Sequence, residues 1–441
     1  MGSYQAAPRT PGVCMFVYNN MMHDARVRKE ARTLVEAGYD VTVVAVYEPG
    51  RTIRNETVDG FRIVRQSRSI LGLSRREIIS FVLRKPLTQA TPKVHPQGRG
   101  AASSGRRGAA ARAFSLLESA VRLAVYPLRR VVVFGRFLRA GLRTRADVYH
   151  AHDLNTLLMG WSASWRRRGR LVYDTHEVAT ARAAMKFRWW AAVLERALIR
   201  RADRVICTTE TRAEFTRERY GIPMPTVLRN LPAYAEPEPS GLIRERLGLP
   251  ARVKIVLYQG GIQPERGLEQ LLEAATHIRG GVVVLLGSGR LKPRLIEQTA
   301  KLGLTQVVRF HDAVPVEELP LWTAEAYVGL QVLQNTCFNH YSSLSNKLLE
   351  YLMAGVPVIA NDLPEMRRLI EETGAGIMVD ASDSRAIASA VNRILADPEE
   401  RERMSQAAKG ARQTFCWEKE AHILIDLYDD LLPLRGASAR V

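Results

Sequence analysis

The pattern that most constrains the fold is a strand–helix–strand alternation that occurs twice along the chain. Short apolar runs at 12–18 and 41–46 flank a helix-forming segment, and a second set begins at 254–258. Largely apolar runs of this length indicate parallel strands covered on both faces of a sheet. The proline-rich residues 231–252 separate the two halves. The sequence therefore predicts an α/β protein with two Rossmann-like domains, in which ligands bind beyond the carboxyl ends of the strands.

Residues 341–362 predict a helix whose first turn suits an anion. A loop of small polar residues, 342–346, precedes a helix-forming segment. Free backbone N–H groups and the positive end of the helix dipole attract phosphate there. Lys347 adds a full charge, and Glu350 is suited to a sugar hydroxyl. The alternative is an ordinary capped helix with an i,i+3 ion pair between these two side chains.

Size and composition indicate a globular protein of two domains. The chain has 441 residues, of which 46% are hydrophobic and 25% are charged. No apolar run is long enough for a membrane span, and no signal-peptide pattern opens the sequence. The four cysteines are scattered without CxxC spacing, which predicts free thiols in a reducing cytoplasm and no zinc site.

The positive charge is concentrated in one segment. The net charge is +19, and residues 84–145 carry 14 Lys and Arg against one acid. Residues 88–112 predict a mobile loop. Residues 113–142 mix arginines with apolar residues, as an interfacial helix on an anionic bilayer does. The alternative is a domain helix that buries its apolar face on the sheet. We expect an anionic membrane surface as the partner of 84–145, and no nucleic acid.

A polar turn follows the first strand of the chain. It contains His23, Asp24 and Arg26. Asp24 is a plausible helix N-cap, and the three residues lie where ligands bind in a doubly wound sheet. A cap with solvated charges and a ligand-binding turn remain equal alternatives.

Several motifs, in this order and spacing, resemble the GT-B glycosyltransferases of the family 4 type. They are D-A-R-V (24–27) with L-V-E-A-G-Y-D-V (34–41), H-A-H-D (150–153), Y-D-T-H-E (173–177), A-D-R-V-I (202–206), Y-Q-G-G-I-Q-P-E-R-G-L-E (258–269) and S-N-K-L-L-E-Y-L-M-A-G-V-P-V-I (345–359). The basic segment lies outside the resemblance.

The resemblance implies an acceptor domain and a nucleotide-sugar domain with a cleft between them. We place these at 1–235, with 84–145 as a basic insertion, and at 251–413; a last helix at 414–433 would cross back to the first domain. The implied reaction is retaining transfer from a nucleotide-sugar, most simply a UDP-sugar, with no cofactor and no metal. The sequence is compatible with transfer without a metal, because it has no DxD motif to hold a divalent cation.

The resemblance also implies roles for particular residues. The chemistry falls to His152, Arg266 and Lys347, and donor binding to Gly260, Gly261, Ser342, Ser343, Leu344, Ser345, Asn346, Glu350 and His311. Three positions depart from the family pattern. Gly261 stands where an arginine is expected, Arg266 replaces a lysine, and Ser342 replaces an acid that helps to bind the donor sugar. We expect Lys347 to supply the missing charge.

His152 matches the family histidine that lines the sugar site, and we expect it to hydrogen-bond the donor sugar. A front-face mechanism is implied, in which the departing phosphate oxygen takes the proton of the acceptor. His23, Asp24, Arg26 and His176 are the candidates for the acceptor side. We interpret His150 as the last, structural residue of its strand.

Four functions remain open. The first is a cytoplasmic glycosyltransferase, peripheral on the inner face of the plasma membrane, that elongates a lipid-linked or polysaccharide acceptor. The second is a soluble glycosyltransferase of small-molecule metabolism. The third is a sugar-nucleotide epimerase of the same fold, and the fourth is a non-catalytic binding protein, suggested by Gly261 and Ser342.

Overall fold

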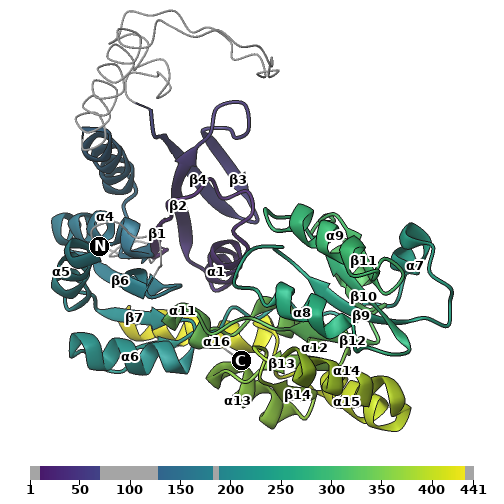
Figure 1. Cartoon of the computed structure of the whole chain (residues 1–441). Helices are drawn as coiled ribbons and strands as arrows, with labels where there is room; N and C mark the ends of the chain where they lie inside the picture. The colour runs from purple at the N-terminus through teal and green to yellow at the C-terminus, as the bar shows by residue number, and fades with distance from the viewer. Residues whose placement is uncertain (1–9, 70–127, 182–187, 433–441) are drawn as a thin grey trace, which may run out of the picture. The chain divides into compact units, whose positions relative to one another are not determined.

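The computed structural model describes residues 10–69, 128–181 and 188–432. These residues form two sheets with helices on their faces (Figure 1). The first sheet has the strand order β3-β4-β2-β1-β5-β6-β7-β8, and the second has the order β11-β10-β9-β12-β13-β14. The predicted α/β architecture with two Rossmann-like halves is confirmed.

The strands of the first sheet follow the predicted apolar runs closely. They are β1 (Gly12–Phe16), β2 (Asp40–Tyr47), β3 (Asn55–Val58), β4 (Phe61–Ser67), β5 (Val148–His152), β6 (Arg170–Thr175), β7 (Arg204–Cys207) and β8 (Thr226–Val227). No sequence pattern predicted β3, which pairs antiparallel with β4 at the edge of the sheet. An edge strand needs no second apolar face, so N-E-T-V lacks the apolar run that marks its neighbours.

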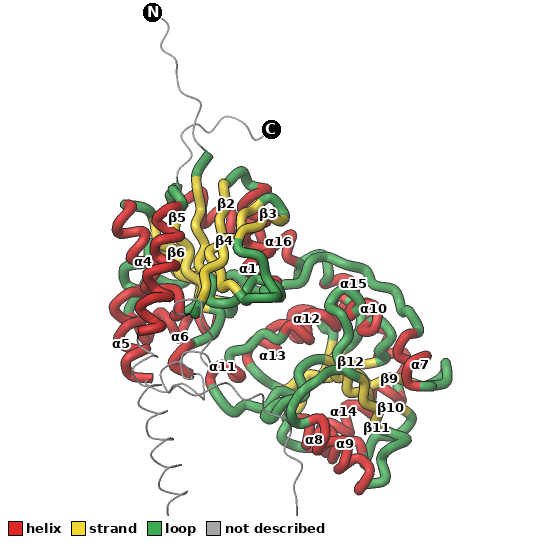
Figure 2. Tube along the Cα trace, turned by 90° about the horizontal axis from the view of Figure 1, so that it is seen from above, coloured by secondary structure: helices red, strands yellow, loops and turns green. Residues whose placement is uncertain are grey.

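The strands of the second sheet are β9 (Lys254–Gln259), β10 (Gly281–Leu286), β11 (Val308–His311), β12 (Val328–Gln331), β13 (Val358–Asn361) and β14 (Gly376–Val379). All of their pairings are parallel. One core cluster fills the face covered by α8 (Leu268–Ala275), α9 (Lys292–Lys301) and α14 (Ser384–Ala396). A second fills the face covered by α7 (Leu242–Leu247), α10 (Leu319–Thr323), α12 (Asn346–Met353), α13 (Pro364–Thr373) and α15 (Pro398–Ala411). Figure 2 shows α8, α9 and α14 together along one side of these strands.

The chain divides into two compact units. One contains residues 1–172 with 201–203, and the other contains 173–200 with 204–441. The first sheet itself runs on to β8, beyond residue 172. The domain limits expected from the sequence therefore stay a prediction.

Helices cover both faces of the strands in the first unit. Helix α1 (Ala25–Glu36) buries Val27, Ala31 and Leu34. A helix whose described part covers 128–143 joins a separate core cluster with residues of β1 and β2. Since successive strand residues point to opposite faces, the two helices lie on opposite faces of the sheet.

The helix at 128–143 corrects the interpretation of the basic segment. Val133 and Phe137 are 1% and 0% exposed and pack in the core of the sheet. Gly141 approaches the ring of Phe16 so closely that a Cβ would lie 2.3 Å from its Cζ. Val133 and Phe137 therefore stabilise the domain, as the alternative of a domain helix predicts, while Leu128 and Val131 are 53% and 66% exposed. The rest of the basic segment, including the mobile loop expected at 88–112, lies outside the described residues. Within the described residues, no helix is both long enough and apolar enough to span a membrane.

Helix α12 is seated against β9 through a tyrosine and a glycine. The Tyr351 hydroxyl donates to the Leu257 carbonyl oxygen at 2.8 Å and accepts from the Gln259 N–H at 3.2 Å. Gly329 of β12 makes room for the ring, because a Cβ there would lie 2.5 Å from Cγ of Tyr351. The start of α12 is thereby fixed beside the carboxyl end of β9.

The last helix, α16 (Trp417–Leu431), is tied to the segment that carries β7 and β8. The Trp417 N–H donates to the Pro232 carbonyl oxygen at 2.7 Å. Glu420, whose side chain is 2% exposed, accepts from the Arg229 N–H at 2.6 Å and pairs with its guanidinium at 2.8 Å. The helix expected to return toward earlier strands therefore contacts residues 229–232.

Replacing Glu420 with alanine should destabilise this attachment strongly. Removal of Glu420 leaves the partly buried guanidinium of Arg229 and its backbone N–H without their acceptor, at a cost of about 1–3 kcal/mol. We expect the free energy of unfolding, measured by urea denaturation and circular dichroism, to fall by that order. Asp426→Ala, on an exposed position of the same helix, should change it by less than about 0.5 kcal/mol. Equal effects of the two changes would contradict the anchoring role.

Candidate active site

The turn after β1 is organised by Asp24. Its carboxylate accepts from the Val27 N–H at 3.1 Å, as an N-cap of α1 does, and from the Asn19 side-chain amide at 2.6 Å. The predicted cap is confirmed. His23 is exposed. The acceptor-side role of both residues stays a prediction.

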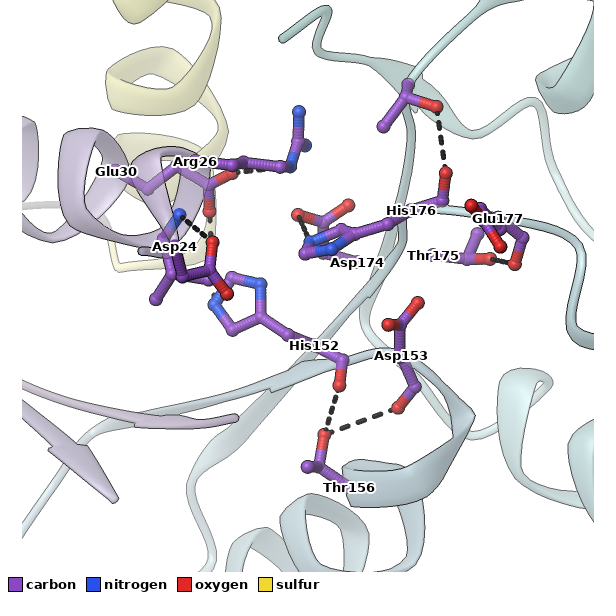
Figure 3. A network of polar contacts seen from close by, with 12 residues as sticks. Asp24, Arg26, Glu30, His152, Asp153, Thr156, Asp174, Thr175, His176 and Glu177 are labelled. Carbon is purple, nitrogen blue, oxygen red and sulfur yellow. Dashed lines mark hydrogen bonds and ion pairs between the residues drawn. The ribbon is translucent and has the colours of Figure 1, made fainter. Parts of the chain in front are cut away.

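Arg26 and Glu30 form a buried pair on α1. Their side chains are 5% and 0% exposed, with Nε and Oε1 2.9 Å apart. Nε2 of His152 lies 4.0 Å from the other carboxylate oxygen of Glu30 (Figure 3). Burying an ion pair this deeply costs desolvation, which the attraction between the two charges has to offset. Arg26 is thus part of an internal network beside the predicted sugar-site histidine.

His152 itself belongs to β5, which corrects the expected strand end. The strand continues past His150 because its pairing with β1 extends to Ala151. The two histidine rings stack with centroids 4.2 Å apart, and both side chains are buried. His150 is therefore not the terminal residue, and His152 is held rigidly at the carboxyl end of the strand.

Asp153 follows in a strained conformation. Its φ of 63° and ψ of 163° lie in a region that only glycine occupies readily. It precedes α4 (Leu154–Arg167) as the N-cap but makes no side-chain cap hydrogen bond. Strain of this kind concentrates at functional sites, and we identify Asp153 as a site residue that sequence reasoning used only as part of a motif.

His176, in the second unit, is held at both its ring and its backbone. Its ring nitrogen Nε2 lies 3.1 Å from Oδ2 of the buried Asp174 (Figure 3). Its carbonyl oxygen accepts from Nη1 of Arg212 at 2.6 Å. The carboxylate orients the imidazole, which suits a group that contacts a substrate. The acceptor-side role of His176 stays a prediction.

The loop after β9 meets the loop after β10 backbone to backbone. A Cβ on Gly287 would lie 1.9 Å from the carbonyl oxygen of Gly260, and one on Gly289 would lie 2.0 Å from that of Ile262. Gly260 has a φ of 117°, and a Cβ there would lie 2.4 Å from Cε of Lys347. Lys347 therefore crosses the loop in the space that the missing side chain leaves.

The surroundings of Lys347 lower its pKa and so favour its neutral form. Its Nζ lies 5.3 Å from the ring centroid of Tyr258. Burial and, to a lesser extent, the charge of Arg266 lower the pKa of Lys347 to about 8, while Glu350 opposes the shift. Two cations that repel each other in this way stabilise an anion placed between them. The structure thus brings together the two predicted cations, Lys347 and Arg266.

Glu350 is oriented by residues outside the predicted set. Its Oε2 accepts from Nε2 of Gln259 at 2.6 Å, and Oε1 of Gln259 accepts from the Thr323 hydroxyl at 2.8 Å. Burial raises the pKa of Glu350, while the Gln259 hydrogen bond and the Lys347 charge lower it. The carboxylate is thus fixed in position with one oxygen left to accept from a hydroxyl. The motif Y-Q-G-G contained Gln259, but nothing in the sequence pointed to its pairing with Glu350.

The start of α12 partly fits the predicted phosphate cradle. The Ser343 N–H donates to the His340 carbonyl oxygen at 3.2 Å, and its part in the cradle stays a prediction. Among the described residues, the amides of Leu344, Ser345 and Asn346 donate to no backbone carbonyl. They lie at the positive end of the helix dipole, beside Lys347.

Ser342 faces the protein interior. It is 0% exposed, and its hydroxyl donates to the Phe338 carbonyl oxygen at 2.7 Å and accepts from Nε of Arg212 at 3.1 Å. Arg212, on α6 (Glu210–Tyr220), also donates to the carbonyl oxygen of Asn339 at 3.1 Å. A ligand role for Ser342 would have to replace one of these bonds. The serine at the expected acid position holds the loop to α6.

Gly261 and His311 lie close to the same loops. Gly261 is exposed, and a Cβ there would meet nothing closer than Cγ of Gln263 at 3.7 Å. His311 ends β11, its ring lies tilted against that of Trp322 with centroids 4.6 Å apart, and its carbonyl oxygen accepts from the Gly287 N–H. The missing arginine at 261 is therefore not excluded by packing.

Comparisons with known proteins agree with this geometry. The family "Glycosyl transferase 4-like domain" matches residues 24–231, and the family "Glycosyl transferases group 1" matches residues 240–411. The D-inositol 3-phosphate glycosyltransferase of Thermobispora bispora is 29% identical over 326 residues, which is 67% of this chain and 75% of that protein.

Solved structures share the fold. Sucrose-phosphate synthase from Thermosynechococcus elongatus superimposes with a TM-score of 0.70 at 18% identity, over 96% of this chain and 99% of that one. HepE of Anabaena, solved in complex with UDP, gives a TM-score of 0.68 at 14% identity, over 96% and 100%. The fold is that of the two-domain GT-B glycosyltransferases. With both family matches in sequence along it, the chain belongs to the GT-B glycosyltransferases of the family 4 type, and it is an enzyme of that class.

The charge state of Lys347 predicts a pH dependence of diphosphate binding. UDP serves as the probe, because a bound diphosphate raises the pKa of Lys347 and so takes up a proton above pH 8. Its dissociation constant should stay level below a pH of about 8 and rise by up to about tenfold per pH unit above it. Isothermal titration calorimetry measures both the affinity and the proton uptake.

Lys347→Met keeps the length of the side chain and removes the charge. It should weaken UDP binding at neutral pH by about 2 kcal/mol and abolish the inflection. A wild-type profile that stays flat through pH 9 would contradict a diphosphate at Lys347.

Proposed function

We propose that the enzyme moves a sugar, with retention of configuration, from a UDP-sugar to its acceptor. The observation that supports this most is the pairing at the start of α12. There Lys347 and Arg266 converge beside unengaged backbone amides, and Glu350 stands one turn on. An anion site next to a fixed carboxylate matches a diphosphate followed by a ribose. HepE, the structural relative with UDP bound, makes UDP the first donor to test.

In this proposal the leaving diphosphate is stabilised without a metal or other cofactor. Lys347, Arg266 and the first amides of α12 would take the charge that develops as the glycosidic bond breaks. Gln259 holds Glu350 in place so that its carboxylate accepts from a ribose hydroxyl. His152 would hydrogen-bond the sugar, and the departing phosphate oxygen would take the proton of the acceptor on the front face.

For the acceptor, we propose a lipid-linked or polysaccharide glycan at the cytoplasmic face of the plasma membrane. The supporting observation is an exposed apolar face on α5 (Arg188–Ile199). Trp189 and Trp190 are each 59% exposed and stack at 4.1 Å, with Val193 and Leu194 one turn further on, 54% and 37% exposed. Exposed patches of this kind mark interaction surfaces, and tryptophan favours the membrane interface.

A second candidate is a soluble, phosphorylated small-molecule acceptor. It is favoured by the similarity to the relative from Thermobispora bispora, a D-inositol 3-phosphate glycosyltransferase. An epimerase would convert the UDP-sugar with no acceptor present, and a binding protein would consume no UDP-sugar. Product analysis of donor alone, and of donor with each acceptor class, separates these functions.

Restoring the cation at position 261 tests the placement of the donor. Gly261→Arg should fold, since the position is exposed and its φ is not in the left-handed region. A guanidinium there should tighten UDP binding by about 2 kcal/mol, as measured by calorimetry. The control Gly261→Gln has a side chain of similar reach without the charge and should change affinity little. Unchanged affinity in the arginine variant would place the diphosphate elsewhere.

Vesicle flotation tests the membrane-surface acceptor. The double variant Trp189→Ser, Trp190→Ser should lose most of its binding to anionic vesicles, because each ring contributes interfacial burial. Trp165→Ser changes another exposed tryptophan, on α4, and should float like the wild type. Flotation of the double variant at the wild-type level would reject α5 as the membrane-facing surface and favour the soluble acceptor.

A further inference from the structure

Positive charge is concentrated around a cavity of the first unit. A cavity of about 700 Å³ opens beside β2 and β4, next to the helix at 128–143. A volume of this size is typical of small-molecule sites. Its wall contains six arginines, namely Arg54, Arg62, Arg136, Arg139, Arg143 and Arg145.

The side chains that line this arginine groove are mostly basic. Asp40 is the one acidic residue in its lining, which leaves a formal charge of +5. The Asp40 carboxylate pairs with Arg62 at 3.0 Å. Guanidinium groups gathered in this way repel one another and raise the local positive potential. Such an arrangement is stabilised by a multivalent anion, and arginine in particular matches the oxygens of a phosphate.

The two walls of the groove are held by different contacts. On the strand side, Cζ of Arg54 lies 4.5 Å from the ring centroid of Tyr47. On the helix side, Nη1 of Arg136 donates to the carbonyl oxygens of Ser67 and Ser69, at 2.9 and 2.6 Å. Arg136 thereby fixes the helix to the end of β4 and keeps the groove open in a defined shape.

Two arginines on the helix wall have their guanidinium groups available. Arg139 and Arg143 are exposed, one turn apart on the same helix. Neither makes a hydrogen bond or an ion pair with any other described residue. Side chains four positions apart project from one helix face, so the two groups can engage one ligand together.

The groove is separate from the turn that follows β1. Thr42 and Val64, which line it, share a sheet face with Val44, and Val44 packs in the core beneath the helix at 128–143. Helix α1, with Asp24 as its N-cap, covers the opposite face. An anion in the groove therefore occupies a different place from the predicted acceptor-side residues Asp24 and Arg26.

We propose that this arginine groove is a binding site for a phosphate-bearing anion, distinct from the donor diphosphate site. Phosphate is the chemistry that the arginines recognise, either on a soluble phosphorylated molecule or on a lipid headgroup. The basic segment that the sequence assigned to a membrane surface thus supplies, in its described part, one wall of a phosphate site. The inference is independent of the proposed transfer reaction.

The test measures inorganic pyrophosphate binding to the full chain by calorimetry, with UDP in excess to occupy the donor site. The wild type should bind pyrophosphate with an affinity that falls as salt is added. The double variant Arg139→Gln, Arg143→Gln should lose on the order of tenfold in affinity. The control Arg51→Gln, Arg166→Gln removes the same charge from exposed positions outside the groove and should bind like the wild type.

The proposal would be overturned if the groove variant, Arg139→Gln with Arg143→Gln, bound pyrophosphate as tightly as the control. It would also be overturned if the wild type bound no pyrophosphate. Should the double variant unfold, Arg54→Gln on the opposite wall gives the same test. If UDP itself fails to bind, the proposed function is wrong, and the groove is still tested by the pyrophosphate titration of Lys347→Met.

Vesicles distinguish the two sources of phosphate. Phosphatidylcholine vesicles with and without phosphatidic acid are compared in flotation. If the groove variant loses both pyrophosphate binding and phosphatidic-acid-dependent flotation, the phosphate belongs to a lipid. If it loses pyrophosphate binding alone, the phosphate belongs to a soluble molecule. Both results support the site and identify its source.

Discussion

The contact between Lys347 and the glycine backbone at 260 is the constraint on which the donor side of the molecule depends. The loops after β9 and β10 approach at distances that exclude a Cβ at Gly260 or Gly287. Tyr351 then fixes α12 against β9. The lysine side chain crosses the loop and lies over the Tyr258 ring. The position of the cation follows from backbone geometry, which accounts for its burial and for its lowered pKa.

In both proposed phosphate sites, positive side chains repel one another until an anion binds. At the start of α12, the charge of Arg266 lowers the pKa of Lys347, which burial lowers as well. In the groove of the first unit, arginines gather around one aspartate. In each place a bound anion would reduce the repulsion between the positive charges. The difference lies in burial. The donor cation is desolvated, whereas Arg139 and Arg143 are exposed, so salt should weaken the groove far more than the donor site.

Sequence reasoning succeeded where a single local pattern carries the information. The apolar runs placed the strands to within a few residues, and Asp24 was identified as the cap it proves to be. It failed where the outcome depends on a distant partner. The helix at 128–143 has the composition of an interfacial helix, but Val133 and Phe137 find a core to fill. The predicted donor role of Ser342 stays a prediction, and its hydroxyl contacts Phe338 and Arg212 of α6, which no local pattern indicates. The periodicity of a helical sequence shows which face of the helix is apolar, but it does not show what packs against that face.

The sequence by itself determined the architecture, the order of the two halves and the identity of the cations, because strand runs, glycine positions and charged side chains are local properties. The tertiary structure alone decided their relations. It placed Gln259 against Glu350, put strain into Asp153, buried Arg26 with Glu30, and gathered arginines from 54, 62 and 136–145 into one groove. The physical reason is that each relation joins residues whose distance is set by chain packing. Side chains far apart in the sequence acquire a shared environment only when the sheet brings their backbones together.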